Sequence, residues 1–64
     1  MSQEEKLRAE LRDSFANRAI LYYEQGAPER ALADFESVLK LDPDNTQARK
    51  GRDFIVGLQS QGSQ

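Results

Sequence analysis

Apolar residues recur at three- and four-residue spacing along most of the chain, a pattern that predicts α-helices. Two breaks interrupt it, at Gly26-Ala27-Pro28 and at Asp42-Pro43. Glycine suits the position after a helix end because its left-handed geometry carries no Cβ penalty. Proline suits a first helical turn and disfavours helical geometry in the residue before it. We therefore predict an all-α chain, with helices over residues 3–25, 28–41 and 45–58.

The predicted middle helix has a single apolar face. The residues of this face share helical spacing and are Ala31, Leu32, Phe35, Val38 and Leu39. An amphipathic helix of this kind buries its apolar face against its neighbours. We expect Phe35, the largest residue of the face, to lie in the core.

The predicted first helix is apolar on two sides. One side, expected to pack on the middle helix and beyond, consists of Leu7, Leu11, Phe15 and Tyr22, with Ala19 at its edge. The other side consists of Ala9, Ala16, Ile20 and Tyr23. A helix with two apolar sides normally needs cover on both. The second cover has to come from the third helix, from another chain or from a ligand.

Arg18 interrupts the first of these two sides. Its aliphatic stem can lie along the edge of the core while the guanidinium reaches water. Alternatively, it pairs with a carboxylate, either across the helical hairpin or across a subunit interface. A buried guanidinium without a partner is too costly to consider.

The predicted third helix is the weakest of the three. Its apolar spacing comes from Ala48, Gly51, Ile55 and Leu58, and Asp44 or Asn45 can cap its first turn. Gly51 and Gly57 each weaken a helix by about 1 kcal/mol relative to alanine. Residues 59–64 contain no large apolar side chain, so we expect a disordered polar tail there.

Together these positions resemble a tetratricopeptide repeat. The residues that carry the resemblance, roughly between Arg12 and Asn45, are Phe15, Ala19, Tyr22, Gly26, Ala31, Phe35 and the run Leu41-Asp42-Pro43. Arg18 and Pro28 depart from the family pattern, which has an aliphatic and an aromatic residue at those places. The resemblance implies an antiparallel helical hairpin in a right-handed superhelical arrangement. The third helix would be the start of a next repeat or a terminal capping helix, and we expect a capping helix because the chain ends soon after it.

The resemblance also implies a concave surface that binds partner peptides. The residues it places there are Asp13, Ala16, Asn17, Ile20, Tyr23 and Glu24 of the first helix, with Lys50 and Phe54 of the third. Some members of the family clamp a peptide carboxylate with an asparagine and a lysine four residues before it. Asn17 matches that asparagine, but Asp13 stands where the lysine should be and would repel a carboxylate. An apolar contact through Ile20, Tyr23 and Phe54 is better supported, and these three side chains can equally well pack on one another within the monomer.

Composition excludes several kinds of chemistry. The chain has no cysteine and no histidine, so it lacks thiolates, disulfides and imidazole ligands for zinc. No nucleophile–base pair stands out, and we expect neither an enzyme nor a cofactor or small-molecule substrate. A calcium loop is superficially suggested by the spacing of Asp42, Asp44, Thr46 and Asp53. Gln47 occupies the place of the required glycine and Pro43 lies inside the loop, so a helix stop and cap is expected instead.

The net charge of −2 argues against nucleic acid as a partner, although Arg49, Lys50 and Arg52 cluster. No apolar run approaches the roughly 20 residues of a membrane span, and no signal-peptide core follows Met1. We therefore expect a cytoplasmic, soluble protein or an excised domain of one.

The chain has one tetratricopeptide-like repeat and a capping helix, whereas about three repeats are normally needed for stability. Two functional hypotheses follow. In the first, the chain is a protein–protein interaction module, an adaptor or scaffold that binds a peptide or helix of a partner. In the second, it is a self-assembly unit that forms a homo-oligomer through Ala16, Ile20 and Tyr23 of the first helix.

Overall fold

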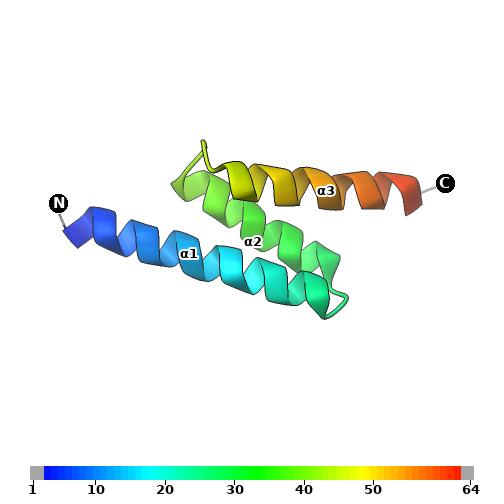
Figure 1. Ribbon diagram of the computed structural model, residues 1–64, viewed down its shortest axis with the longest axis horizontal. Helices are drawn as coiled ribbons and strands as arrows, with labels where there is room; N and C mark the ends of the chain where they lie inside the picture. Colours follow the sequence, from blue (N-terminus) through cyan, green and yellow to red (C-terminus); the bar gives the residue numbers. More distant parts are fainter. Residues whose placement is uncertain (1–2, 63–64) are drawn as a thin grey trace.

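The computed structural model describes residues 3–62 and consists of three helices joined by two short connections (Figure 1). The helices are α1 (Gln3–Glu24), α2 (Pro28–Leu41) and α3 (Thr46–Gly62), and no strand occurs among the described residues. The all-α fold predicted from the sequence is confirmed. The bounds of α1 and α2 lie within one residue of those expected from the glycine and proline signals.

α3 extends further than expected. The sequence predicted a disordered tail from residue 59, whereas α3 includes residues 59–62. Extending an existing helix fixes one residue for each new hydrogen bond, and glutamine is a good helix former, so a polar stretch without a breaker continues the helix. Residues 63 and 64 of the predicted tail lie outside the described part of the chain.

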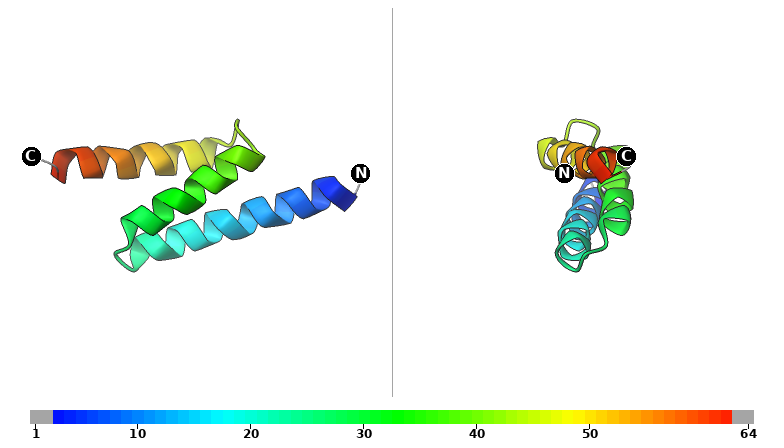
Figure 2. Two further views of the ribbon diagram at one scale, coloured as in Figure 1. Left: turned by 180° about the vertical axis from the view of Figure 1, so that it is seen from behind. Right: turned by 90° about the vertical axis from the view of Figure 1, so that its right-hand side faces the viewer.

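α2 is the central element of the molecule. It packs extensively against both α1 and α3, whereas α1 and α3 make far fewer contacts with each other. Figure 2 shows that the N-terminal turns of α1 and the C-terminal turns of α3 extend past opposite ends of α2. The molecule is therefore elongated, with principal extents of 48 × 22 × 13 Å.

The turn between α1 and α2 is a Schellman-type helix end. The Ala27 N–H donates to the Tyr22 carbonyl at 2.8 Å and the Gly26 N–H donates to the Tyr23 carbonyl at 3.1 Å. Gly26 has a positive φ of 81°, which this motif requires at the residue after the helix end. Pro28 then opens α2 at a position where its missing N–H would have no intrahelical partner. The hairpin therefore forms where the sequence predicted it.

The core lies where the three helices meet along α2. Its fully or nearly fully buried apolar residues are Ala19, Ala31, Phe35, Val38, Ala48 and Ile55. Each helix contributes one buried alanine, and small side chains let helix backbones approach closely. Phe15 and Tyr22 are partly buried against this core, as expected from the first apolar side of α1.

Leu7 and Leu11 do not join the core. We expected them to pack on the middle helix, but both side chains are more than half exposed. α1 has 22 residues and α2 has 14, so α2 cannot cover the whole length of α1. At a rise of about 1.5 Å per residue, the difference leaves roughly two turns of α1 without a neighbour.

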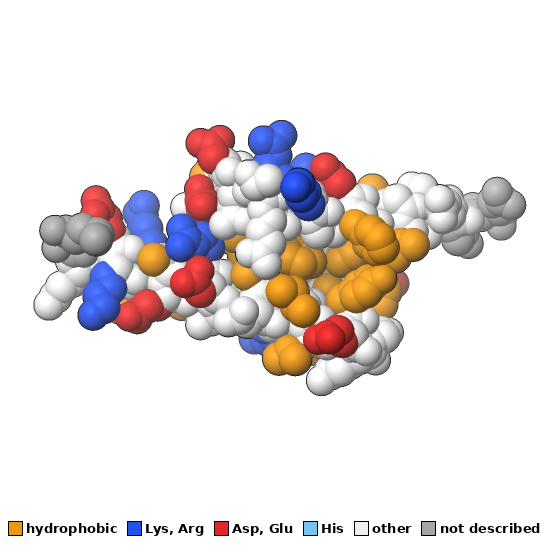
Figure 3. Space-filling model, viewed as in Figure 1, with side chains coloured by type: hydrophobic (Ala, Val, Ile, Leu, Met, Phe, Trp, Pro, Cys, Tyr) orange, Lys and Arg blue, Asp and Glu red, His pale blue; other side chains and the backbone are white. Residues whose placement is uncertain are grey.

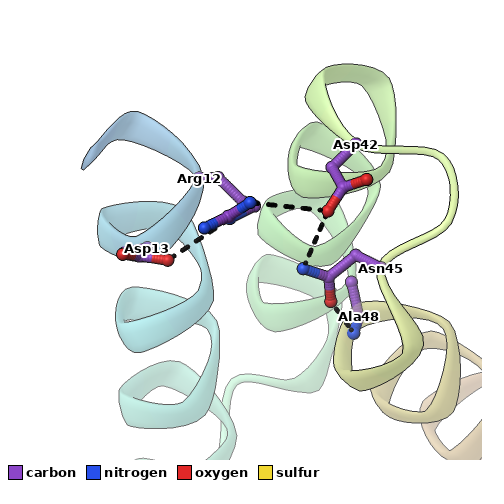
Figure 4. Close-up of polar contacts among 5 residues, drawn as sticks. All are labelled: Arg12, Asp13, Asp42, Asn45 and Ala48. Atoms are coloured by element: carbon purple, nitrogen blue, oxygen red, sulfur yellow. Dashed lines mark hydrogen bonds and ion pairs between the residues drawn. The ribbon is translucent and has the colours of Figure 1, made fainter. Parts of the chain in front are cut away.

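The connection between α2 and α3 is tied to α1 by a short polar chain (Figure 4). The Asn45 side chain accepts a hydrogen bond from the Ala48 N–H at 2.8 Å and so caps α3. The Asn45 amide group donates to Asp42 Oδ2 at 3.4 Å, and Arg12 Nη1 lies 3.6 Å from the same oxygen. Arg12 therefore links α1 to the loop that sets where α3 begins.

Candidate binding surface

An apolar hollow of about 230 Å³ opens between α1 and α3. Its lining residues come from all three helices and are Ile20, Tyr23, Phe35, Gly51, Phe54 and Ile55. Figure 3 shows apolar side chains gathered between α1 and α3 on the face of the molecule turned to the viewer. This is the largest accumulation of apolar surface on that face.

The rim of the hollow consists of three large side chains. Ile20 and Tyr23 are three residues apart on α1 and project from one side of it, and Phe54 projects from α3. The Tyr23 and Phe54 rings meet edge to face, with centroids 5.7 Å apart and an interplanar angle of 71°. Even so, Ile20 and Tyr23 are each 40% exposed and Phe54 is 55% exposed. The two rings therefore pack on each other and still present apolar area to the solvent.

The floor of the hollow depends on Gly51. A Cβ at this position would lie 2.5 Å from Cζ and 2.7 Å from Cε2 of Phe35, closer than such atoms approach in proteins. α3 can therefore rest on the Phe35 ring only because residue 51 has no side chain. From the sequence, Gly51 was expected to share the apolar spacing of α3 and to weaken the helix, but no close contact was predicted for it. The available signal was a glycine on the apolar face of α3, which often marks close packing.

The structure brings together only some of the residues expected on this surface. Ile20, Tyr23 and Phe54 line the hollow, whereas Ala16 is partly buried and packs against the core. The remaining expected residues are Asp13, Asn17, Glu24 and Lys50; all four are exposed and none lines the hollow. Asp13 accepts a hydrogen bond from Nε of its neighbour Arg12 at 3.3 Å.

Arg18 lies outside the hollow and holds the hairpin together. Its Nε donates to Asp34 Oδ2 at 2.7 Å and its Nη2 donates to Asp34 Oδ1 at 2.9 Å. These hydrogen bonds, and then the charge of the carboxylate, raise the pKa of the Arg18 guanidinium above its ordinary value. The guanidinium also lies 5.6 Å and 5.7 Å from the ring centroids of Phe15 and Tyr22. Of the alternatives left open by the sequence, the structure shows a carboxylate partner across the hairpin.

The described residues show neither a cluster of metal ligands nor a membrane-spanning helix. Within residues 3–62, no cluster of three or more potential ligands is placed to hold a metal ion. Asp42, part of the calcium-like run in the sequence, is engaged by Arg12 and Asn45. None of the helices in the described part of the chain has the length and apolar character needed to cross a membrane.

Comparison with known proteins supports the resemblance noted in the sequence. Neither the curated proteins nor the solved structures include a significant match to the chain. The model of the tetratricopeptide repeat family, however, matches residues 13–45, just over half of the chain. Repeats of this family generally mediate protein–protein interaction and are not catalytic modules. The match spans α2 and the C-terminal half of α1, including the turn at Gly26 and the pairing of the two helices. The chain therefore belongs to the tetratricopeptide repeat family.

Proposed function

We propose that this chain is an adaptor or scaffold module that binds a peptide or helix of a partner protein in the hollow between α1 and α3. The observation that carries the proposal is the exposure of Ile20, Tyr23 and Phe54 around one apolar hollow. Large apolar side chains gathered on one exposed surface are typical of interaction sites. Aromatic residues in particular supply much of the binding energy at such sites.

The size of the hollow favours a side chain of a protein over a free small molecule. Its volume is about 230 Å³, while small-molecule pockets usually enclose about 300–1,000 Å³. A space of this size accommodates one or two bulky apolar side chains. Its lining contains no charged residue that would orient a substrate. A partner helix can place such side chains at i and i+3 or i+4 while its remaining surface stays in water.

Self-assembly is the second candidate, and one observation favours it. Ile20 and Tyr23, two of the three residues expected in a homo-oligomer interface, are each 40% exposed. Ala16, the third residue expected in that interface, is partly buried against the core of its own chain, so it offers less surface to a second copy. An oligomer would therefore be built on Ile20, Tyr23 and Phe54, the same rim that a different partner would cover.

Site-directed photo-crosslinking tests the first proposal. A photoreactive phenylalanine analogue replaces Phe54 in the hollow, and the matched control carries it at Val56, which is also exposed but does not line the hollow. We expect a crosslinked partner protein from position 54 and none from position 56. Ile20→Ser combined with Tyr23→Ser should abolish the crosslink while the circular dichroism of the hairpin is unchanged. Equal crosslinking from both positions, or none from either, contradicts the proposal.

Sedimentation at several concentrations separates the two candidates. An interaction module that awaits a partner remains monomeric when purified, whereas a self-assembly unit increases in mass with concentration. If the wild-type chain associates, the Ile20→Ser and Tyr23→Ser double variant should be monomeric. A wild-type chain that stays monomeric and cooperatively folded at high concentration excludes the self-assembly candidate.

A further inference from the structure

Glu24 places a negative charge at the end of α1, next to Tyr23 of the hollow. Glu24 is the last residue of α1 and follows Tyr23 directly, one turn after Ile20. The C-terminal end of a helix carries a partial charge of about −0.5 from its backbone dipoles. The last turn of α1 contains no basic residue to offset it. Within residues 3–62, no ion pair involves Glu24.

The two edges of the hollow differ in charge. One side of α1 carries Ile20 together with Asp13, Asn17 and Glu24. Residues that follow Asp13 by 4, 7 and 11 positions point in nearly the same direction around the helix. The charge of Asp13 is already partly offset by Arg12, so the free carboxylate of this edge is Glu24. On the opposite edge, Lys50 lies four residues before Phe54 on α3 and has no ion pair among the described residues. The apolar hollow thus lies between an acidic edge on α1 and a basic edge on α3.

We propose that the hollow selects a partner segment in which a bulky apolar side chain is flanked by lysine or arginine on the side that faces Glu24. This inference rests on the proposed function and adds the chemistry of the partner to it. A cation at that position meets both the Glu24 carboxylate and the negative end of α1. A carboxylate at the same position is repelled by both. Charges at the rim of an interface discriminate between partners in this way, through attraction to one and repulsion of the other.

Two synthetic peptides test the proposal against the full 64-residue chain. Both are short amphipathic helices with leucines at i, i+3 and i+7 and glutamates along the side that faces Lys50, and they differ only in carrying lysine or glutamate along the side that faces Glu24. Fluorescence anisotropy measures the Kd of each, and NMR shift changes at Ile20 and Phe54 locate the binding. We expect the lysine peptide to bind roughly fivefold more tightly at low salt, because the lysine-to-glutamate exchange turns a weak surface attraction into a repulsion. High salt should reduce this preference through screening.

Charge variants of the protein show whether Glu24 is responsible. Glu24→Gln should remove most of the preference and Glu24→Lys should reverse it. The matched control is Glu36→Gln, which changes the net charge equally at an exposed residue of α2 that does not line the hollow. This control should keep the full preference. Thermal melts verify that all three variants fold, which is expected because both glutamates are exposed.

The possible outcomes separate this proposal from the one it rests on. Equal binding of the two peptides with shifts at the hollow overturns the charge selection and leaves the interaction module in place. A preference that survives Glu24→Gln also overturns it. Tighter binding of the glutamate peptide, or binding of neither peptide, overturns it as well. The interaction module itself fails if photo-crosslinking from position 54 finds no partner, or if positions 54 and 56 crosslink equally.

Discussion

Arg18 in α1 and Asp34 in α2 form a two-point ion pair that joins the helices of the hairpin, with nitrogen–oxygen distances of 2.7 and 2.9 Å. The pair is asymmetric, because the Asp34 side chain is only 7% exposed while that of Arg18 is 55% exposed. The carboxylate has therefore lost most of its hydration and relies on one guanidinium. That guanidinium also lies beside two aromatic rings.

Removing one partner of this pair should destabilise the hairpin more than removing both. Arg18→Met leaves a nearly buried carboxylate without its cation, whereas Arg18→Met with Asp34→Leu replaces the pair with apolar packing. Urea unfolding should therefore place the double variant above the Arg18→Met single variant in stability. Glu36→Gln, which removes an exposed carboxylate from the same helix, should change stability little. Additive effects of the two single substitutions would contradict the coupling.

The two central glycines of α3 should respond to alanine in opposite directions. A Cβ at Gly57 meets no atom within 4 Å, while a Cβ at Gly51 would collide with the Phe35 ring. Gly57→Ala should therefore stabilise the chain by up to about 1 kcal/mol through helix propensity alone. Gly51→Ala should destabilise it by about 1–3 kcal/mol, because α3 must move off the ring. Thermal melts of the two variants check this, and stabilisation by both would refute the role of Gly51.

Phe35→Ala should destabilise the chain far more than Tyr23→Ala. Phe35 is 5% exposed and lies where all three helices meet, so its loss leaves a cavity. Such a substitution costs about 3–5 kcal/mol. Tyr23 is 40% exposed at the rim of the hollow and supports much less of the fold. Equal shifts in Tm would show that the assignment of the core face is wrong.

Asn45→Ala should weaken α3 from its first turn. The Asn45 side chain accepts the Ala48 N–H at 2.8 Å, and loss of a cap of this type costs about 1 kcal/mol. Asn45→Ser retains an oxygen acceptor for the Ala48 N–H without placing a second carboxylate beside Asp42, so it should preserve most of the stability. Gln47→Ala, an exposed change in the same turn, is the control. Chemical denaturation of the three variants would detect the difference. Equal stability of Asn45→Ala and Gln47→Ala would show that the cap does not stabilise α3.

Local signals were enough to predict the hairpin. Gly26, Pro28 and Pro43 act through the geometry of their own backbones, so their effect can be read without knowing what surrounds them. The apolar spacing of α2 correctly predicted its buried face, because α2 packs against both other helices. The rim residues Ile20, Tyr23 and Phe54 were expected on one surface from the family resemblance, and they do line one hollow.

The features that could not be predicted from the sequence depend on how the helices are placed relative to one another. Several carboxylates could have met Arg18, and the choice of Asp34 follows from the register of α1 on α2. The exposure of Leu7 and Leu11 follows from the unequal lengths of two elements, which no periodicity within α1 reveals. From the sequence, Gly51 was expected to weaken α3. Its stabilising role depends on a contact with another helix, where it lets α3 approach the Phe35 ring.

α3 rests on α2 along one face and meets α1 mainly at the contact of Phe54 with Tyr23. We therefore expect α3 to open locally more often than the hairpin, which the Gly26 turn and the Arg18–Asp34 pair hold together. Amide hydrogen exchange in α3 should therefore be faster than in α2, with the slowest α3 amides near the buried Ile55. A partner seated between α1 and α3 binds the closed arrangement, so it slows that exchange by a factor set by its concentration and Kd. The exchange rate of α3 amides thus measures occupancy of the hollow directly, even for a partner that carries no label.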